Sequence, residues 1–391
     1  MKNTCVGKRS KPACRAAIGA AVALSLSLAA APAQAAVIVV NNAGDAGPGS
    51  LRAAITAANG TAAADTIVFN LGAPAVYVIN LVAPLPAVTR PLTIDGLTQA
   101  GAACPAAWAP NLEVVLNGTG AGAGAGLTFT GLAAGSLVRG LVVQGFNGDG
   151  VVLQAANVAL ECNFIGTTVA GTAPLANAGN GVQVNAPGAR IGGATDAQRN
   201  VIAGNALAGV LVSPAGVGDQ GNSIANNYVG LGATLGVVNN GGAGVRVTSQ
   251  PGTEITRNVI SANVGFGPIG IDLGLAGATP NDPGDVDAAP IANSGQNFPV
   301  ITAASGGTGR IDVTLDTLAG AYRLEYFTSP VAGPLGRQYL GSLAVAHPGG
   351  VAAYTSPVYG LVAGQYVTVT ATRLAAPLDS SEFSVSRVVV P

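Results

Sequence analysis

The chain has 391 residues, of which 49% are apolar and only 9% are charged. A disordered chain is excluded, because valine, isoleucine and leucine recur in ordered short runs. With 17 Lys and Arg residues against 18 Asp and Glu residues, the charge balance also argues against nonspecific binding to nucleic acid.

Residues 1–36 have the features of a secretory signal peptide. An apolar segment, residues 16–31, precedes the small-residue cleavage pattern Ala33-Gln34-Ala35. Basic residues precede this segment: Lys2, Lys8, Arg9, Lys11 and Arg15. The apolar segment is short for a membrane-spanning helix. We therefore expect a secreted, periplasmic or cell-surface protein that does not span a membrane once the signal is removed. The remaining chain would have 12 basic and 18 acidic residues, a net charge of −6.

The chain after the signal begins with two predicted strands, residues 37–40 and 66–69, that flank a predicted helix. Ser50 can cap this helix, and Asn59-Gly60 can end it. Its apolar positions have helical spacing: Leu51, Ala54, Ile55 and Ala58. A short amphipathic helix beside the first strands would suit the open end of a stack of strands, which otherwise exposes its core.

Two cysteines remain after the signal. Cys104 lies with Trp108 in residues 98–110, a predicted insertion loop, and Cys162 lies in the repeats described next. An even pair in an exported protein predicts one disulfide, which would tie the loop to the repeats. The alternative is two buried free thiols.

Residues 141–273 repeat themselves. Asparagines precede short apolar runs at four positions: Asn163, Asn200, Asn227 and Asn258. Glycines open alternating strands at four others: Gly150, Gly181, Gly209 and Gly244. One more apolar residue lies between each pair: Leu160, Ile191, Ile224 and Ile255. Three short strands per repeat predict a solenoid of stacked coils.

The alternation within these strands predicts which side chains face the interior. Val182 and Val184 should point inward and Gln183 outward. Val182, Val210 and Val245 should form one aligned interior file. Val152, Gln183, Leu211 and Arg246 should form an outer column. The turn asparagines should bond backbone groups and stack from coil to coil. Two longer loops, residues 167–179 and 231–242, should project from the same side.

Several runs in this chain resemble one family. The segment DAGPGSLRAAITAAN (45–59), followed by ADTIVF (64–69), resembles the N-terminal module of bacterial exported right-handed parallel β-helix proteins. NFIGT (163–167) and RNVIAGN (199–205) are similar to the coil repeats of that family. The resemblance implies an all-β, right-handed parallel β-helix with an N-terminal capping helix. It does not imply one activity, because the fold hosts many.

After Phe298 the spacing changes to that of longer, hairpin-like strands. These are residues 311–315, 322–327, 340–345, 366–371 and 383–390. They predict a small antiparallel β-sandwich. The predicted domains are therefore a signal peptide (1–36), a parallel β-helix with its cap (37–296) and a β-sandwich-like domain (297–391).

No catalytic residue can be assigned from sequence motifs. The His-Glu-x-x-His, Gly-x-Ser-x-Gly and phosphate-loop patterns are absent. A glycoside hydrolase would need two carboxylates roughly 5–10 Å apart. The candidate carboxylates of the coils are spread one per coil: Asp149, Glu161, Asp196, Asp219 and Glu254.

Two groups of side chains are candidate binding sites. Oxygen ligands closely spaced in a loop suit Ca²⁺, and Asp272, Asp282, Asp285 and Asp287 provide such a group. The alternative is a solvated turn. A candidate binding face on the coils comprises Gln183, Arg190, Arg199, Arg246 and Arg257. No cofactor other than calcium is expected.

The sequence favours a non-catalytic protein with a structural, adhesive or glycan-binding role. Its partner would be an extracellular polysaccharide or a cell-surface component. The alternative function is a polysaccharide lyase or glycoside hydrolase acting on an extracellular polysaccharide. Converging carboxylates, or arginines beside a calcium site, would distinguish the enzyme from the binding protein.

Overall fold

The computed structural model describes residues 34–214, 220–261, 263–265, 267–287 and 291–391. The predicted signal peptide lies outside the described residues, apart from residues 34–36. Residues Gln34–Pro391 form one compact unit. In these ranges, no helix is both long and apolar enough to cross a bilayer.

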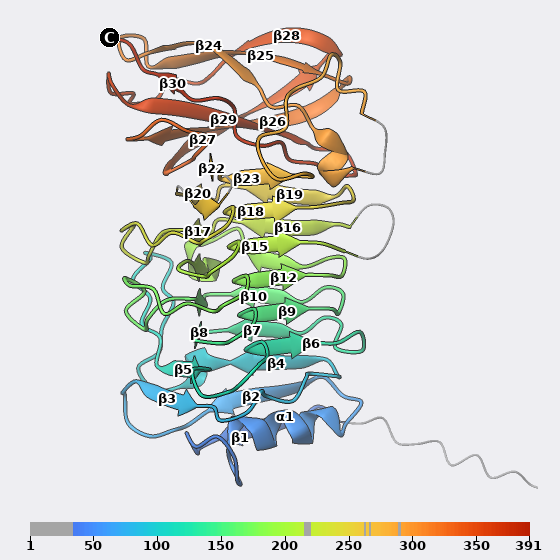
Figure 1. The fold of residues 1–391 in the computed structure, drawn as a ribbon, viewed down its shortest axis with the longest axis vertical. Coiled ribbons are helices and arrows are strands. Elements are labelled where there is room, and N and C mark those ends of the chain that lie inside the picture. The colour runs from blue at the N-terminus through green and yellow to red at the C-terminus, as the bar shows by residue number, and fades with distance from the viewer. Residues whose placement is uncertain (1–33, 215–219, 262, 266, 288–290) are drawn as a thin grey trace, which may run out of the picture. The chain divides into compact units, whose positions relative to one another are not determined.

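Three parallel sheets are formed by strands that recur in turn along the chain, one strand per sheet in each full coil (Figure 1). The first sheet contains β1 (Val37–Val40), β2 (Asp65–Phe69), β4 (Leu92–Asp95), β7 (Leu137–Arg139), β10 (Ala159–Glu161), β13 (Arg190–Gly192), β16 (Asn222–Ala225) and β19 (Thr253–Thr256). The second contains β3 (Tyr77–Asn80), β5 (Val114–Asn117), β8 (Leu141–Gln144), β11 (Phe164–Ile165), β14 (Val201–Ile202), β17 (Tyr228–Val229) and β20 (Val259–Ile260). The third contains β6 (Leu127–Phe129), β9 (Val151–Leu153), β12 (Val182–Val184), β15 (Val210–Val212), β18 (Val245–Val247) and β23 (Ile271–Leu273). This arrangement is that of a parallel β-helix.

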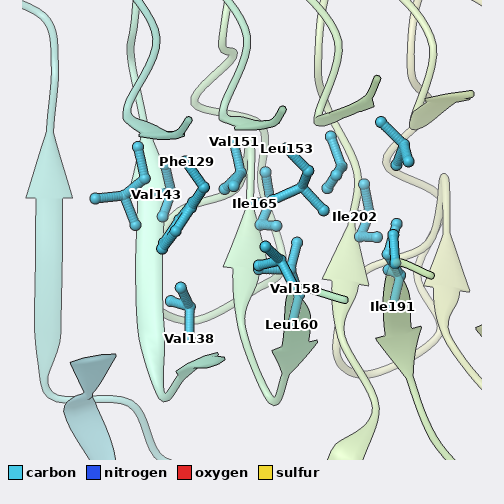
Figure 2. Packing of buried hydrophobic residues seen from close by; sticks show 14 of the residues in the cluster. Phe129, Val138, Val143, Val151, Leu153, Val158, Leu160, Ile165, Ile191 and Ile202 are labelled. Atoms are coloured by element: carbon cyan, nitrogen blue, oxygen red, sulfur yellow. The ribbon is translucent and has the colours of Figure 1, made fainter. Parts of the chain in front are cut away.

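The predicted alignment of the coils is confirmed by the strand register. Val182 pairs with Val210, and Val210 pairs with Val245, so the three valines form one file. The predicted outer column is also present in the third sheet: Val152, Gln183, Leu211 and Arg246. The inward residues of all three sheets meet in one apolar interior, into which Val151, Leu153 and Ile165 project (Figure 2).

Glycine opens the strands of the third sheet because successive coils approach closely there. A Cβ added to Gly181 would lie 2.6 Å from the carbonyl oxygen of Gly209. A Cβ on Gly209 would lie equally close, 2.6 Å, to the carbonyl oxygen of Gly244. No side chain fits at this spacing, so the repeat of glycine has a steric cause.

Asparagine ladders run along two of the turns. In the first ladder the side chains of Asn163, Asn200, Asn227 and Asn258 bond one another at 2.9–3.1 Å. This confirms the prediction that turn asparagines stack from coil to coil. A second ladder, absent from the sequence predictions, joins Asn177, Asn205, Asn240 and Asn263 at 2.9–3.0 Å. All eight side chains are buried and bond backbone groups as well.

Loops cover the outer face of the second sheet. The predicted loops 167–179 and 231–242 do lie side by side, since the Ala233 amide donates to the Gly171 carbonyl at 2.8 Å. Residues 98–110 lie over the same face, and Cys104 forms the predicted disulfide with Cys162. A second apolar cluster therefore lies outside the coils, between this sheet and its loops.

The predicted helix is α1 (Leu51–Asn59). Ser50 is its N-cap, because the Ser50 hydroxyl accepts a hydrogen bond from the Ala53 amide at 3.2 Å. All four predicted apolar positions are buried: Leu51, Ala54, Ile55 and Ala58. They join the interior cluster beside β1 and β2. Short 3₁₀ segments also occur: η1 (Gly96–Thr98), η2 (Asp196–Gln198) and η3 (Ala292–Gly295).

The C-terminal residues form antiparallel sheets. One contains β24 (Val300–Ser305), β25 (Arg310–Thr317) and β28 (Gly350–Thr355). The other contains β26 (Gly320–Ser329), β27 (Gln338–His347), β29 (Tyr366–Arg373) and β30 (Arg387–Val388). A short ribbon of β21 (Val264–Gly265) and β22 (Gly267–Pro268) precedes them. The two larger sheets share one buried apolar cluster. The predicted strand at residues 383–390 is wrong for most of its length, since only Arg387 and Val388 are in β30. Two earlier residues of this segment, Phe383 and Ser384, are buried instead.

Side chains from the C-terminal residues bond the free backbone groups of the last coil. Asp379 accepts from the Gly252 amide at 2.7 Å, and Ser380 accepts from the Ile255 amide at 2.8 Å. Glu325 accepts from the Arg257 amide at 3.1 Å. Glu382 accepts from the amides of Leu273 and Thr279 at 3.0 and 3.1 Å. The unpaired N–H groups at this edge are therefore satisfied.

Candidate functional site

The five residues of the predicted binding face do not lie on one face. Gln183 and Arg246 belong to the third sheet, where Arg246 lies 3.2 Å from the carboxylate of Asp272. Arg190 is in the first sheet on β13, and Arg257 follows β19 of that sheet. Arg199 precedes β14 of the second sheet. The chain turns a corner between each pair of sheets, so spacing along the sequence could not place these side chains together.

Two of them nevertheless meet in one pocket, which we call the arginine groove. Its volume is about 490 Å³. It is lined by Asp196, Arg199, Asn226, Tyr228, Leu235, Arg257, Val259, Arg337, Gln338 and Tyr339. Successive coils provide the first seven residues, of which Tyr228 and Val259 lie on β17 and β20, and β27 with the residue before it provides the last three. The groove thus combines residues far apart in the sequence.

Arg199 forms the floor of the groove. Its guanidinium donates to the carbonyl oxygen and the side-chain oxygen of Asn226 at 3.1 and 2.6 Å. It also donates to the hydroxyl of Tyr228 at 3.1 Å and to the Asp196 carboxylate at 2.6 Å. Only 7% of Arg199 is exposed. Because these partners occupy its donors, Arg199 is a positioning residue rather than a free cation.

Arg257 and Arg337 are the accessible cations of the groove. Arg257 donates to the Ala194 carbonyl at 2.8 Å, and Arg337 donates to the Leu235 carbonyl at 3.1 Å. Among the described residues neither forms a salt bridge. Arg257 also has a positive φ of 52°, an uncommon conformation for a residue with a side chain. The buried Glu325 accepts from the Arg257 main-chain amide, but the guanidinium groups of both half-buried arginines are left without a salt bridge among the described residues, which makes this pocket suitable for an anion.

The tyrosines of the groove can act as hydrogen-bond donors. Burial raises the pKa of Tyr228, although the nearby Arg199 charge opposes this shift. Burial likewise raises the pKa of Tyr339. Both phenols therefore keep their protons at neutral pH, when each can donate a hydrogen bond but cannot act as a base.

The candidate carboxylates of a hydrolase have structural partners. Asp149 accepts from the Asn180 amide at 2.6 Å, and Glu161 accepts from Gln198 at 3.1 Å. Asp196 pairs with Arg199 at 2.6 Å, and Glu254 pairs with Arg323 at 2.7 Å. Asp219 lies outside the described residues. These four described carboxylates are thus each engaged in a different local contact.

Three of the four predicted calcium ligands come together. Ligand oxygens of Asp282, Asp285 and Asp287 all lie within 4.8 Å of one another. Asp272 is not part of this cluster, because it lies on β23 and pairs with Arg246. One buried oxygen of Asp282, Oδ1, has no hydrogen-bond partner. Burial and the charges of Asp282 and Asp287 raise the pKa of Asp285 to about 6, against the hydrogen bonds donated by Thr317 and Asn297.

A larger cavity of about 740 Å³ lies beside Arg246. Residues 273–280, mostly apolar or glycine, form much of its wall. Its arginine is already paired with Asp272, so the cavity offers less unpaired charge than the arginine groove.

The comparisons with known proteins do not assign a family. Neither a protein family nor a curated protein matches this sequence. Among solved structures, the enzymatically active domain of bacteriophage CBA120 tailspike protein 2 matches with 9% identity and a TM-score of 0.16. The match covers 84% of this chain and 66% of the tailspike domain, so the chain spans less than two thirds of that domain.

Proposed function

We propose that this protein is exported and binds an acidic extracellular polysaccharide in the arginine groove without cleaving it. One observation carries the proposal. Arg257 and Arg337, each oriented by a main-chain carbonyl and free of salt bridges within the described ranges, line the same pocket as Tyr339.

The chemistry of these side chains fits a sugar polymer that bears carboxylates. The planar guanidinium of arginine can bind a carboxylate through two parallel hydrogen bonds. Tyr339 offers an apolar ring with a polar tip, against which the C–H face of a sugar can pack. A groove with two available cations and one carboxylate, Asp196, favours a ligand with several negative charges.

The lyase alternative requires a base in the groove. Tyr228 and Tyr339 lie there, but burial raises both pKa values, which is opposite to the shift that a tyrosine base needs. The hydrolase alternative requires two free carboxylates on either side of a bond. Asp196 is the one carboxylate that lines the groove, and Arg199 holds it. These properties favour binding over cleavage.

We expect the double variant Arg257→Ala, Arg337→Ala to lose most of its affinity for acidic polysaccharide. Each charge-assisted hydrogen-bonded contact contributes about 1.5–3 kcal/mol, so the combined loss should exceed about 100-fold. Calorimetric titration with polygalacturonate and alginate, at two salt concentrations, measures this loss. Dextran is the uncharged comparison.

Arg190→Ala is the matched control, because Arg190 is exposed on the first sheet and does not line the groove. Unchanged binding by the double variant, or equal binding to dextran, would contradict the proposal. Release of reducing ends or of unsaturated uronates by the wild-type protein would favour an enzyme instead.

We further propose that the coils wind in the right-handed sense and that α1 closes their first end. The two C-terminal antiparallel sheets would then form a β-sandwich. The helix buries its apolar side against β1 and β2, and the two sheets share one apolar cluster, which supports both proposals.

We also propose that Asp282, Asp285 and Asp287 bind Ca²⁺. Calcium prefers oxygen ligands in irregular geometry, and a cation would neutralise the like charges of Asp282 and Asp287, which add to burial in raising the pKa of Asp285. Calcium at 100 times its dissociation constant should raise the free energy of unfolding by about 2.7 kcal/mol. Thermal melting in EDTA and in CaCl₂ measures this shift.

The variant Asp287→Asn tests the site with little structural cost, since Asp287 is exposed. It should lose most of the calcium effect, whereas Asp312→Asn, outside the cluster, should keep it. Equal melting temperatures with and without calcium would show that the cluster is a solvated turn.

A further inference from the structure

Residues 98–110 form a strap that crosses several coils. Its stem is closed by two hydrogen bonds between Ala103 and Asn111, at 2.8 and 2.9 Å. The strap begins at Thr98, the last residue of η1, which follows β4. Its tip reaches the loop after β17, because the indole N–H of Trp108 donates to the Ala233 carbonyl at 2.9 Å. Three coils separate β4 from β16 in the first sheet, so the strap connects distant levels of the stack.

The strap is held covalently between its two ends. Cys104 is bonded to Cys162, which is fully buried beside β11 in the second sheet. The disulfide fixes the strap four residues before Trp108. The position of Trp108 on the coils therefore depends on two anchors, the disulfide and the bond to Ala233.

Trp108 stacks against the floor of the arginine groove. The guanidinium carbon of Arg199 lies 5.1 Å from the centre of the Trp108 ring and 4.3 Å from the centre of the Tyr228 ring. The two rings meet edge to face at 5.5 Å and 72°. Arg199 thus contacts both rings through cation–π interactions, and these are stronger where water is excluded.

We infer that the strap is a positioning device for the groove, with Trp108 as the positioning residue. Trp108 restrains Arg199 and Tyr228. These two residues form the floor of the groove, against which a ligand held by Arg257 and Arg337 packs. Pre-organising a binding surface raises affinity because less motion is lost on binding. This inference rests on the proposed function, since it assigns a second determinant of affinity to the same groove.

Trp108 is the only tryptophan in the sequence, so its fluorescence reports on the strap directly. We expect Trp108→Ala to weaken binding of polygalacturonate about tenfold, through loss of the stacked ring. Trp108→Phe keeps an aromatic edge and should restore affinity to within about threefold of wild type. The variant Cys104→Ser, Cys162→Ser should show red-shifted tryptophan emission and a similar loss of affinity.

Circular dichroism and calcium-free melting establish that each variant is folded. Should a folded Trp108→Ala variant bind with wild-type affinity, the inference is overturned while the proposed function stands. Wild-type protein that binds no acidic polymer would instead overturn the proposed function. Equal losses in Trp108→Phe and Trp108→Ala would also reject positioning by the ring. Should Cys104→Ser, Cys162→Ser fail to fold, reduction of the folded wild-type protein by a phosphine provides the same comparison.

Discussion

Replacing Asn200 with alanine should lower the free energy of unfolding by about 3–5 kcal/mol, because several buried polar groups lose their partners at once. Asn200 is fully buried in the first asparagine ladder. Its oxygen accepts from the backbone and side chain of Asn163, and its nitrogen donates to Leu160 and Asn227. Alanine satisfies none of these groups, and the site is too enclosed for bulk water to replace them.

Chemical denaturation of Asn200→Ala beside wild-type protein measures this effect. Asn70→Ala is the matched control, since Asn70 is exposed just after β2 and its free energy of unfolding should change by less than about 0.5 kcal/mol. If both variants are equally stable, the ladders do not stabilise the stack.

The second large effect is a loss of stability as pH rises. Burial raises the pKa of Glu382 from its ordinary 4.5 to about 7, and burial raises that of Asp285 from 3.8 to about 6. The folded protein thus binds these protons more tightly than the unfolded chain. The stability that these two protonated carboxyl groups contribute is fully present below their pKa values in the unfolded chain. It is lost as pH rises through their pKa values in the folded protein. Between pH 5 and pH 8 we expect a fall of about 4 kcal/mol in the free energy of unfolding, roughly 2.5 of it from Glu382.

Chemical denaturation at several pH values measures how the free energy of unfolding depends on pH. EDTA is present so that no metal ion binds to Asp282, Asp285 and Asp287. Glu382→Gln cannot ionise, so its profile should be flatter by roughly 2.5 kcal/mol over the same range, even though the amide forms one hydrogen bond fewer. The control Asn70→Ala removes no titratable group and should keep the wild-type slope. A protein that becomes more stable between pH 5 and pH 8 would contradict the raised pKa values.

The stacking of the coils could be predicted because it depends on local periodicity. Alternation with a period of two placed Val182 and Gln183 on the correct sides, and the glycine before each strand marked a close contact between coils. The first asparagine ladder could be predicted because a short apolar run follows each of its members, although their spacing is irregular at 37, 27 and 31 residues. In the second ladder Asn177 and Asn205 are followed by alanine and Asn240 by glycine, so no such run marked them.

The candidate site could be predicted only in part. Arg199 and Arg257 were candidates, but their meeting with Arg337 and Tyr339 depends on how the C-terminal sheets lie against the last coils. Arg337 is 102 residues from its partner Leu235, a separation that no periodic pattern reports. Tyr228 had a signal, since it is aligned in register with Phe164, Val201 and Val259 and is the residue among them that carries a hydroxyl group.

The carboxylates that bond the last coil affect whether copies of the protein associate at high concentration. A solenoid with a bare terminal rung offers a template on which another copy can grow, and repeated addition produces fibres. Here Asp379, Glu325 and Glu382 already occupy the amides of that rung. Head-to-tail polymerisation through this end is therefore blocked, and the protein can reach a high concentration without seeding insoluble filaments from it.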